Sequence, residues 1–120
     1  MIYGNVPNTG LIAGLPDGTC VEVPCLVGRN GLRPTQVLDY PPHLAALNRT
    51  YANVVELTVR AVLEERPDYV RIAALLDPST SATLTLDEVE ALCDELTLAH
   101  GDLIPAALRG TAVEEGVGVR

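Results

Sequence analysis

The side chains of this sequence that could act as nucleophiles or metal ligands are few. Cysteine occurs at positions 20, 25 and 93, and the two histidines are His43 and His100. No CxxC pair is present, so the sequence indicates neither a zinc ribbon nor a disulfide framework. The conceivable Cys–His pair is Cys25 with His43. A reactive thiol needs an accessible, electropositive setting, whereas Cys25 lies in an apolar run, so we interpret it as a small core residue.

The other titratable side chains are predicted to be structural. His43 is expected at a helix start, where the helix dipole disfavours a cation, and His100 near a helix C-terminus, where it can interact with the last carbonyls. Five acidic residues between positions 87 and 95 are interpreted as a solvated helix face. The sequence also lacks GxSxG, GxGxxG and the Walker loop. We therefore predict no catalytic, cofactor-binding or metal-binding residue in this chain.

A set of polar residues is better suited to binding than to catalysis; it consists of Asn5, Asn8, Arg29 and Asn30. Asparagine offers a donor and an acceptor that match sugar hydroxyls, and arginine suits a phosphate or a carboxylate. The same residues also fit turn chemistry, because Asn-Gly is a strong hairpin signal and Asn and Pro favour loops. A substrate loop and plain turns both remain open interpretations.

Charge and composition exclude several classes of partner. Eight arginines, no lysine and sixteen acidic residues give a formal net charge of -8. This balance argues against nucleic acids and against anionic membrane surfaces. No apolar run approaches the roughly 20 residues of a membrane span, and residues 1–4 do not resemble a signal peptide. We therefore expect a cytoplasmic protein with no membrane partner, whose core is aliphatic because Trp and Phe are absent.

The elements that position these residues begin with a small antiparallel β meander, expected in the first third of the chain. Pro16-Asp17-Gly18 predicts a turn after a short apolar run at residues 11–13. Residues 20–27 alternate in polarity, which places Cys20 and Cys25 on opposite faces of a strand. Asn30-Gly31 predicts the centre of a type I′ turn. A third strand over residues 32–38 would lie at an edge because it contains Pro34.

Three or four packed helices are predicted to follow, so the fold class is α+β. Pro41-Pro42 can start the first helix, and Pro67 can open a second over residues 68–76. Thr85 and Glu88 fit a capping box at the start of another, which Gly101 would end, before a short turn over residues 105–108. The first helix carries a wide apolar stripe, Leu44, Leu47, Tyr51, Val55, Thr58 and Val62. The later helix would bury Leu86, Val89, Leu92, Cys93, Leu96 and Ala99.

Several motifs in a fixed order carry a family resemblance. They are Asn5-Val6-Pro7-Asn8-Thr9-Gly10, Val21-Glu22-Val23-Pro24, Arg29-Asn30-Gly31 and Pro41-Pro42-His43-Leu44-Ala45-Ala46-Leu47-Asn48-Arg49. With them, the chain resembles the C-terminal region of the NAD- and manganese-dependent family 4 glycoside hydrolases, and most of all their α-galactosidase and α-glucosidase branch. The likeness runs from about Asn5 to about Leu103. Gly14 and Gly28 depart from the family pattern, where Asn and Asp are expected.

The resemblance implies that this chain functions only together with a partner. In the family, the nucleotide fold and the metal-binding Cys and His belong to an upstream portion, and none of those positions exists in this sequence. We therefore expect a C-terminal-like domain over residues 1–109 and a flexible tail over 110–120. The chain would belong to an NAD- and Mn²⁺-dependent glycosidase without being catalytic alone or binding either cofactor alone. Its expected partners are an N-terminal nucleotide-binding portion or a second copy, and a glycoside. The alternatives are a self-associating or accessory interaction domain, or a sugar-binding protein.

Overall fold

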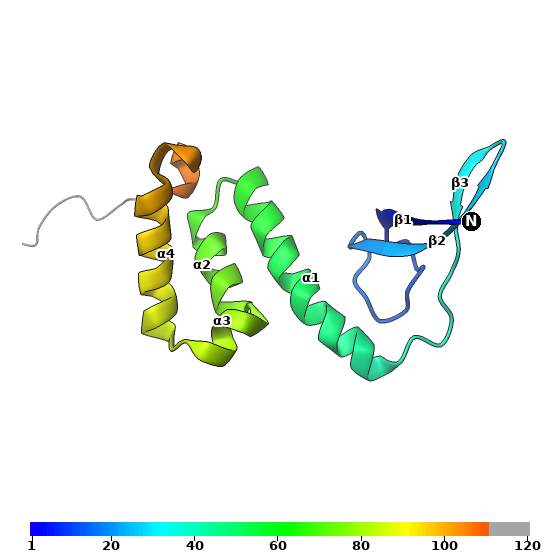
Figure 1. Cartoon of the computed structure of the whole chain (residues 1–120), viewed down its shortest axis with the longest axis horizontal. Coiled ribbons are helices and arrows are strands. Elements are labelled where there is room, and N and C mark those ends of the chain that lie inside the picture. The colour runs from blue at the N-terminus through cyan, green and yellow to red at the C-terminus, as the bar shows by residue number, and fades with distance from the viewer. Residues whose placement is uncertain (111–120) are drawn as a thin grey trace, which may run out of the picture. The chain divides into compact units, whose positions relative to one another are not determined.

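A computed structural model describes residues 1–110, which form a three-stranded sheet followed by four α-helices (Figure 1). The α+β class predicted from the sequence is confirmed. The chain divides into two compact units, Met1–Ala52 and a second that begins at Asn53, and the boundary falls inside helix α1 (Pro42–Leu63). The tail predicted over residues 110–120 lies, from residue 111 on, outside the described residues.

The first unit contains the antiparallel sheet, whose strand order is β1-β2-β3. Strand β1 (Ile2–Pro7) pairs along most of β2 (Cys20–Gly28), from Ile2 opposite Cys25 to Pro7 opposite Cys20. Strand β3 (Gly31–Pro34) pairs only with the end of β2, from Cys25 to Gly28. The meander is therefore confirmed, with a third strand shorter than the predicted residues 32–38. The apolar run at residues 11–13 is not a strand and contributes a single bridge between Ile12 and Val37.

The hairpin between β2 and β3 has a different turn from the one predicted. Gly28 pairs with Gly31, so the central residues are Arg29 and Asn30 instead of Asn30 and Gly31. A type I′ turn needs positive φ at both central residues, and neither Arg29 nor Asn30 has it. The positive φ falls instead at Gly31, at 93°, as in hairpins that place a glycine bulge after the turn. The predicted turn position was wrong by one residue, because Gly31 adopts its positive φ as the first residue of β3 and not inside the turn.

The core of the first unit lies on one face of the sheet. Val21, Val23 and Cys25 alternate onto that face and are buried together with Ile12 from the loop between β1 and β2. Cys20 is exposed and Cys25 is buried, which confirms that the two cysteines occupy opposite faces. Packing is close at Gly4, where a Cβ would lie 3.1 Å from the sulfur of Cys25. The core contains no side chain larger than isoleucine among these buried residues, in accordance with the aliphatic composition.

Helix α1 begins at Pro42, as predicted, and in this chain alone its predicted apolar stripe is exposed. Fully buried positions on α1 are Ala45 and Ala61, whereas large apolar side chains lie in solvent. In the first unit these exposed side chains are Leu44, Leu47 and Tyr51, and in the second unit they are Val55, Val59 and Val62. Periodicity identifies an apolar face without identifying what covers it. Ala45 lies against Gly14 of the same unit, where a Cβ on the glycine would be 3.3 Å from the Cβ of Ala45.

The second unit contains the later helices α2 (Pro67–Leu76), α3 (Pro78–Thr83) and α4 (Leu86–His100), followed by two 3₁₀ turns. Those turns are η1 (Gly101–Leu103) and η2 (Ala106–Leu108). Helix α3 was not predicted, because its sequence is polar and lacks periodicity. Its start is stabilised by Asp77, whose carboxylate accepts hydrogen bonds from the backbone amides of Ser79 and Thr80 at 2.8 and 3.1 Å.

Helix α4 has both of its predicted ends. Thr85 and Glu88 form the capping box, and the Thr85 amide donates to the Glu88 carboxylate at 2.7 Å. Gly101 ends the helix with a φ of 47°. Val89 and Cys93 are buried as predicted, whereas Leu86, Leu96 and Ala99 are exposed.

An ion-pair cluster joins α2 to α4. The guanidinium of Arg71 on α2 contacts the carboxylates of Glu90 and Asp94 on α4. These two acidic partners raise the pKa of Arg71. The acidic face predicted for residues 87–95 is therefore partly engaged in packing the helices, and its other members remain in solvent.

Candidate functional site

Asn8, one of the four predicted substrate-loop residues, lies at the centre of the loop between β1 and β2. Its side chain is 1% exposed. The amide nitrogen donates to the carbonyls of Ile12, Leu15 and Pro16 at 3.2, 3.0 and 3.2 Å. The amide oxygen accepts from the backbone amides of Leu11 and Ile12 at 2.9 and 3.0 Å. Every polar atom of Asn8 is thus used to hold residues 11–16 in place, which is a structural role.

The loop that Asn8 organises is also attached to helix α1. The Arg49 guanidinium donates to the Gly14 carbonyl at 2.7 Å. Gly14 has a φ of 85°, and a Cβ there would lie 3.3 Å from the Cβ of Ala45. Asparagine and glycine are the residues that adopt positive φ most easily. Gly14 therefore adopts a backbone conformation that the Asn expected from the resemblance could also adopt.

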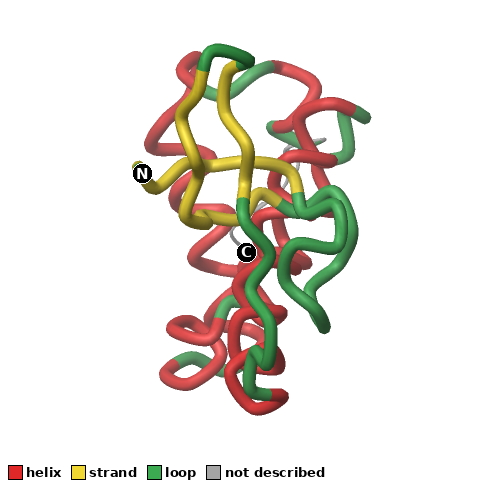
Figure 2. Tube along the Cα trace, turned by 90° about the vertical axis from the view of Figure 1, so that its right-hand side faces the viewer, coloured by secondary structure: helices red, strands yellow, loops and turns green. Residues whose placement is uncertain are grey.

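The other three predicted residues are exposed, but they do not converge. Asn5 lies on β1 opposite Glu22, whereas Arg29 and Asn30 form the tip of the β2–β3 hairpin. Gly28 lies six positions beyond Glu22 along β2, which corresponds to about 20 Å at the rise of a strand. Figure 2 shows the hairpin turn as the far end of the two strands. Contact of these residues with a glycoside stays a prediction, and one pocket formed by all four is not present in the structure.

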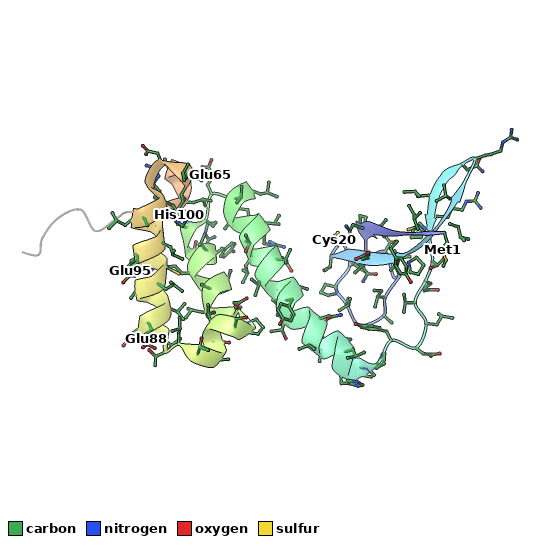
Figure 3. All side chains as sticks on the ribbon, viewed as in Figure 1. Met1, Cys20, Glu65, Glu88, Glu95 and His100 are labelled. Atoms are coloured by element: carbon green, nitrogen blue, oxygen red, sulfur yellow. The ribbon has the colours of Figure 1, made fainter. Side chains whose placement is uncertain are left out.

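The cysteines and histidines are also separated from one another. Cys25 is fully buried, and His43 is exposed in the first turn of α1. His100, labelled in Figure 3, lies with its Nδ1 2.7 Å from the Leu96 carbonyl, the interaction predicted with the last carbonyls of the helix. Burial raises the pKa of the Cys93 thiol, which opposes formation of a thiolate. None of these groups is set up as a nucleophile with a base.

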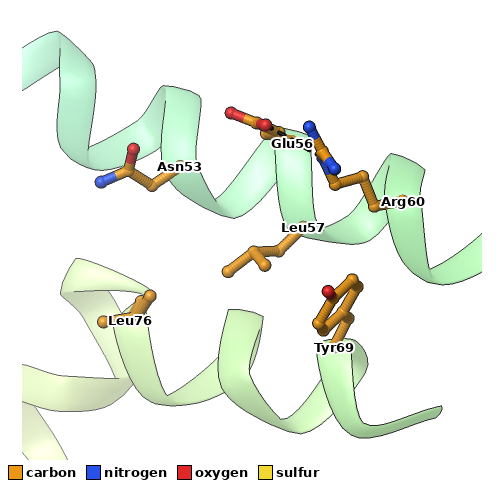
Figure 4. Close-up of a pocket in the computed structure, with 6 residues that line it drawn as sticks. All are labelled: Asn53, Glu56, Leu57, Arg60, Tyr69 and Leu76. Atoms are coloured by element: carbon orange, nitrogen blue, oxygen red, sulfur yellow. Dashed lines mark hydrogen bonds and ion pairs between the residues drawn. The ribbon is translucent and has the colours of Figure 1, made fainter. Parts of the chain in front are cut away.

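A hollow of about 350 Å³ lies in the second unit between α1 and α2 (Figure 4). It is lined by Asn53, Glu56, Leu57, Arg60, Tyr69 and Leu76. The Arg60 guanidinium pairs with Glu56 at 3.0 Å and with Glu64 at 3.3 Å, so its charge is already compensated. Tyr69 faces a second cation, because Arg66 lies 4.4 Å from the ring centroid. The hollow offers polar and apolar contacts without a pair of groups that could catalyse a reaction.

The donor set does not fit the cofactors that the family resemblance implies. Within residues 1–110, no three His, Cys, Asp or Glu side chains come together as metal ligands would. No glycine-rich loop leads from a strand into a helix as a dinucleotide site requires. We therefore assign no NAD or Mn²⁺ ligand to the described part of this chain. None of its helices is long and apolar enough to cross a membrane.

The most prominent feature of the described surface is its exposed apolar side chains. Apart from α1, one such region is the hairpin formed by residues 26–34, all of which are exposed. We call this segment the arm; Figure 1 shows it extending past β1. Leu26, Val27 and Leu32 on the arm are 54%, 61% and 53% exposed. Large exposed apolar patches are typical of surfaces that another protein surface covers.

Comparison with known proteins identifies the family. The model described as "Family 4 glycosyl hydrolase C-terminal domain" matches residues 1–80. An α-galactosidase of Bacillus subtilis (strain 168) is 44% identical over 102 residues, which are 85% of this chain and 24% of that protein. An α-galactosidase of Rhizobium meliloti (strain 1021) is 32% identical over 101 residues, 84% of this chain and 21% of that protein. An α-glucosidase of Erwinia rhapontici is 33% identical over 85 residues, 71% of this chain and 18% of that protein.

The match covers most of this chain and only a fraction of each relative. The chain spans about a quarter of the Bacillus subtilis α-galactosidase and less of the other two. The two motif-rich parts, the β meander and the start of α1, both lie within the residues that the family model matches. The chain therefore belongs to the family of family 4 glycosyl hydrolase C-terminal domains.

Proposed function

We propose that this chain is the C-terminal portion of an NAD- and manganese-dependent glycosidase that hydrolyses α-galactosides or α-glucosides, and that it has no activity alone. The observation that carries the proposal is its 44% identity to part of an α-galactosidase. The missing chemistry would come from a nucleotide-binding portion, carried on the same polypeptide or on another. NAD and Mn²⁺, when bound there, would supply the redox and Lewis-acid steps of the reaction.

In this proposal the chain contributes surface and loop positions instead of reacting groups. The exposed valines of α1, Val55, Val59 and Val62, recur at helical spacing and form one side of the helix. Covering them with the nucleotide-binding portion would remove apolar surface from water at about 25 cal/mol per Å². Such a contact would explain why α1 buries its alanines within this chain and leaves its larger apolar side chains exposed.

The predicted substrate-loop residues divide into two roles within this function. Asn8 fixes the loop, and Asn5, Arg29 and Asn30 are the members whose side chains are exposed to a ligand. We propose that the arm tip, Arg29 with Asn30, edges the sugar site of the completed enzyme. Substituting both by alanine would then raise KM for the glycoside while leaving the fold unchanged. The exposed Leu98→Ala on α4 serves as a control.

Complementation tests the proposed function directly. The purified chain is assayed on a nitrophenyl α-galactoside and a nitrophenyl α-glucoside with NAD, Mn²⁺ and a reductant. The assay is repeated after adding the part of the Bacillus subtilis α-galactosidase that lies outside the matched segment. We expect no hydrolysis by the chain alone, a complex in size-exclusion chromatography, and hydrolysis by the mixture. Hydrolysis by the chain alone, or a mixture that neither associates nor hydrolyses, would refute the proposal.

A further inference from the structure

We propose that Asn30, at the tip of the arm, is a site of spontaneous covalent modification, where the side-chain amide is lost as ammonia and the backbone is in part rerouted through the side chain. This reactivity is independent of the glycosidase function, because it depends on the Asn30-Gly31 dipeptide and on the turn that holds it. Water is the co-reactant, and the step needs neither an enzyme nor a cofactor.

The reaction begins at the backbone nitrogen of Gly31, which is a weak nucleophile until a base removes its proton. The nitrogen then bonds to the side-chain carbonyl carbon of Asn30, Cγ, and the bond from Cγ to Nδ2 breaks, so that ammonia leaves. The product is a five-membered cyclic imide. Water attacks one of its two carbonyl carbons and opens the ring. Attack at Cγ gives aspartate, whereas attack at the main-chain carbon gives isoaspartate, in which the backbone passes through Cγ.

The surroundings of Asn30 and Gly31 leave room for this ring. Both residues are exposed, so that water and hydroxide reach them, and Figure 2 shows their turn at the far end of the two strands. Gly31 has no side chain to hinder the approach of its nitrogen to Cγ. A Cβ built on Gly31 would meet nothing within 4 Å, so the space around the attacking nitrogen is open.

The closed turn sets the condition under which the reaction occurs. The Thr35 amide donates to the Pro24 carbonyl at 2.9 Å, and hydrogen-bonded pairs alternate along an antiparallel ladder. Gly28 and Gly31 are therefore a hydrogen-bonded pair, and the Gly31 nitrogen becomes free when that pair opens. Every residue of the arm is exposed, and a two-stranded hairpin alone is at best marginally stable in water. The arm therefore opens often enough to react.

The other asparagines of the chain serve as internal comparisons, because each of the four is followed by a residue with a side chain. They are Asn5, Asn8, Asn48 and Asn53, followed by Val6, Thr9, Arg49 and Val54. Asn8 is also buried, and its amide nitrogen donates to three carbonyls. Asn48 and Asn53 lie inside α1, where the next backbone amides bond within the helix. We therefore expect the modification to be selective for Asn30.

The two products should differ in their effect on the arm. Either product adds one negative charge to the formal net charge of -8, and this charge lies next to Arg29. Isoaspartate also lengthens the backbone by one atom between Arg29 and Gly31. Because the length of a hairpin loop fixes the register of its strands, the isoaspartate form should lose the pairing of Gly28 with Gly31. The aspartate form keeps the length of the backbone and therefore the register.

Incubation of the full chain in H₂¹⁸O at mildly alkaline pH tests the proposal. Each modified molecule should gain about 3 Da, because the amide nitrogen is replaced by heavy oxygen, whereas modification during a later digestion in ordinary water adds about 1 Da. Peptide mapping by electron-transfer fragmentation locates the site and separates isoaspartate from aspartate. We expect at least about tenfold more modification at Asn30 than at the other four asparagines together.

Two variants and a matched control assign the chemistry. Asn30→Gln should abolish the mass gain, because the longer side chain would have to form a six-membered ring. Gly31→Ala should slow the gain on the order of tenfold, even though the positive φ of 93° strains alanine and favours an open arm. The exposed Asn5→Gln on β1 should leave the rate unchanged. Circular dichroism verifies that each variant is folded.

A synthetic peptide of residues 26–34 supplies the rate of the arm without the rest of the fold. The full chain should react more slowly than the peptide, by less than about a hundredfold, because the closed turn occupies the Gly31 nitrogen for part of the time. The proposal is overturned if the full chain keeps its mass while the peptide is fully converted. It is also overturned if the gain is spread over several asparagines, or if Gly31→Ala reacts as fast as the parent.

Discussion

Replacing Asn8 by alanine should strongly destabilise the first unit, because one side chain satisfies five backbone groups. Two of those groups, the amide and the carbonyl of Ile12, are buried, and the other three are part-buried. A buried polar group left without a partner costs about 1–3 kcal/mol. Counting only the two Ile12 groups, we expect Asn8→Ala to lower the free energy of unfolding by about 3 kcal/mol.

Urea unfolding followed by the near-ultraviolet circular dichroism of tyrosine measures this loss. Tyr3, Tyr40 and Tyr51 lie in the first unit and report on it. With an m-value of about 1–2 kcal/mol per molar urea, the midpoint should fall by about 2 M. The matched control is Asn5→Ala on β1, which is exposed and should change stability by less than about 0.5 kcal/mol.

Asn8→Asp tests whether the stability depends on the hydrogen bonds of the amide, because aspartate has nearly the same size and shape as asparagine. The carboxylate would accept the two backbone amides but would face the three carbonyl oxygens that Asn8 now donates to. Its pKa should be raised in the folded state, so the variant's stability falls as pH rises through 4 to 7. The reasoning is refuted if Asn8→Ala stays within 0.5 kcal/mol of the parent, or if the aspartate variant is insensitive to pH.

Three further predictions concern single positions. The hydrogen bonds from Thr85 lower the pKa of Glu88, so the capping box stabilises the fold above about pH 4.5 and loses this effect on acidification. Thr85→Ala should lower the free energy of unfolding by about 1 kcal/mol at pH 7, and the urea midpoint of this variant should depend less on pH. Gly14→Ala should cost about 1–2 kcal/mol because of the positive φ and the near contact with Ala45, with Gly14→Asn costing clearly less in thermal melts, and equal losses would contradict this. Glu65 has a φ of 53° after the last turn of α1, so Glu65→Gly should raise stability by about 1 kcal/mol in the same melts, and a loss of stability would count against the assignment of strain.

The features that sequence predicted well are those fixed by residues close together in the chain. Pro42 and Pro67 lie at helix starts, and Thr85 with Glu88 forms a capping box within four residues. The opposite faces of Cys20 and Cys25 follow from the alternation of one strand. Each of these depends on local geometry, so the surrounding fold does not change the outcome.

The features that were missed depend on distant partners. The stripe of α1 has the right periodicity, but whether Leu47 or Ala45 faces inward depends on what the helix packs against. Asn8 is an asparagine in a polar loop, and its hydrogen bonds reach carbonyls four to eight residues away. The two asparagines of Asn5-Val6-Pro7-Asn8 therefore suggested a ligand site. In the structure, Asn5 is an exposed residue of a strand, and Asn8 is buried and holds a loop in place.

The close approach of Gly4 to Cys25 also constrains how this sequence can change. A methyl group at position 4 would lie 3.1 Å from the sulfur, so alanine there requires the sulfur to move or to be removed. Cys25→Ala alone would instead open a cavity beneath the sheet. Alanine at position 4 should therefore cost less stability when Cys25 is also replaced by alanine, so the two positions are energetically coupled. A relative that lacks glycine at position 4 is expected to carry a residue smaller than cysteine at the position of Cys25.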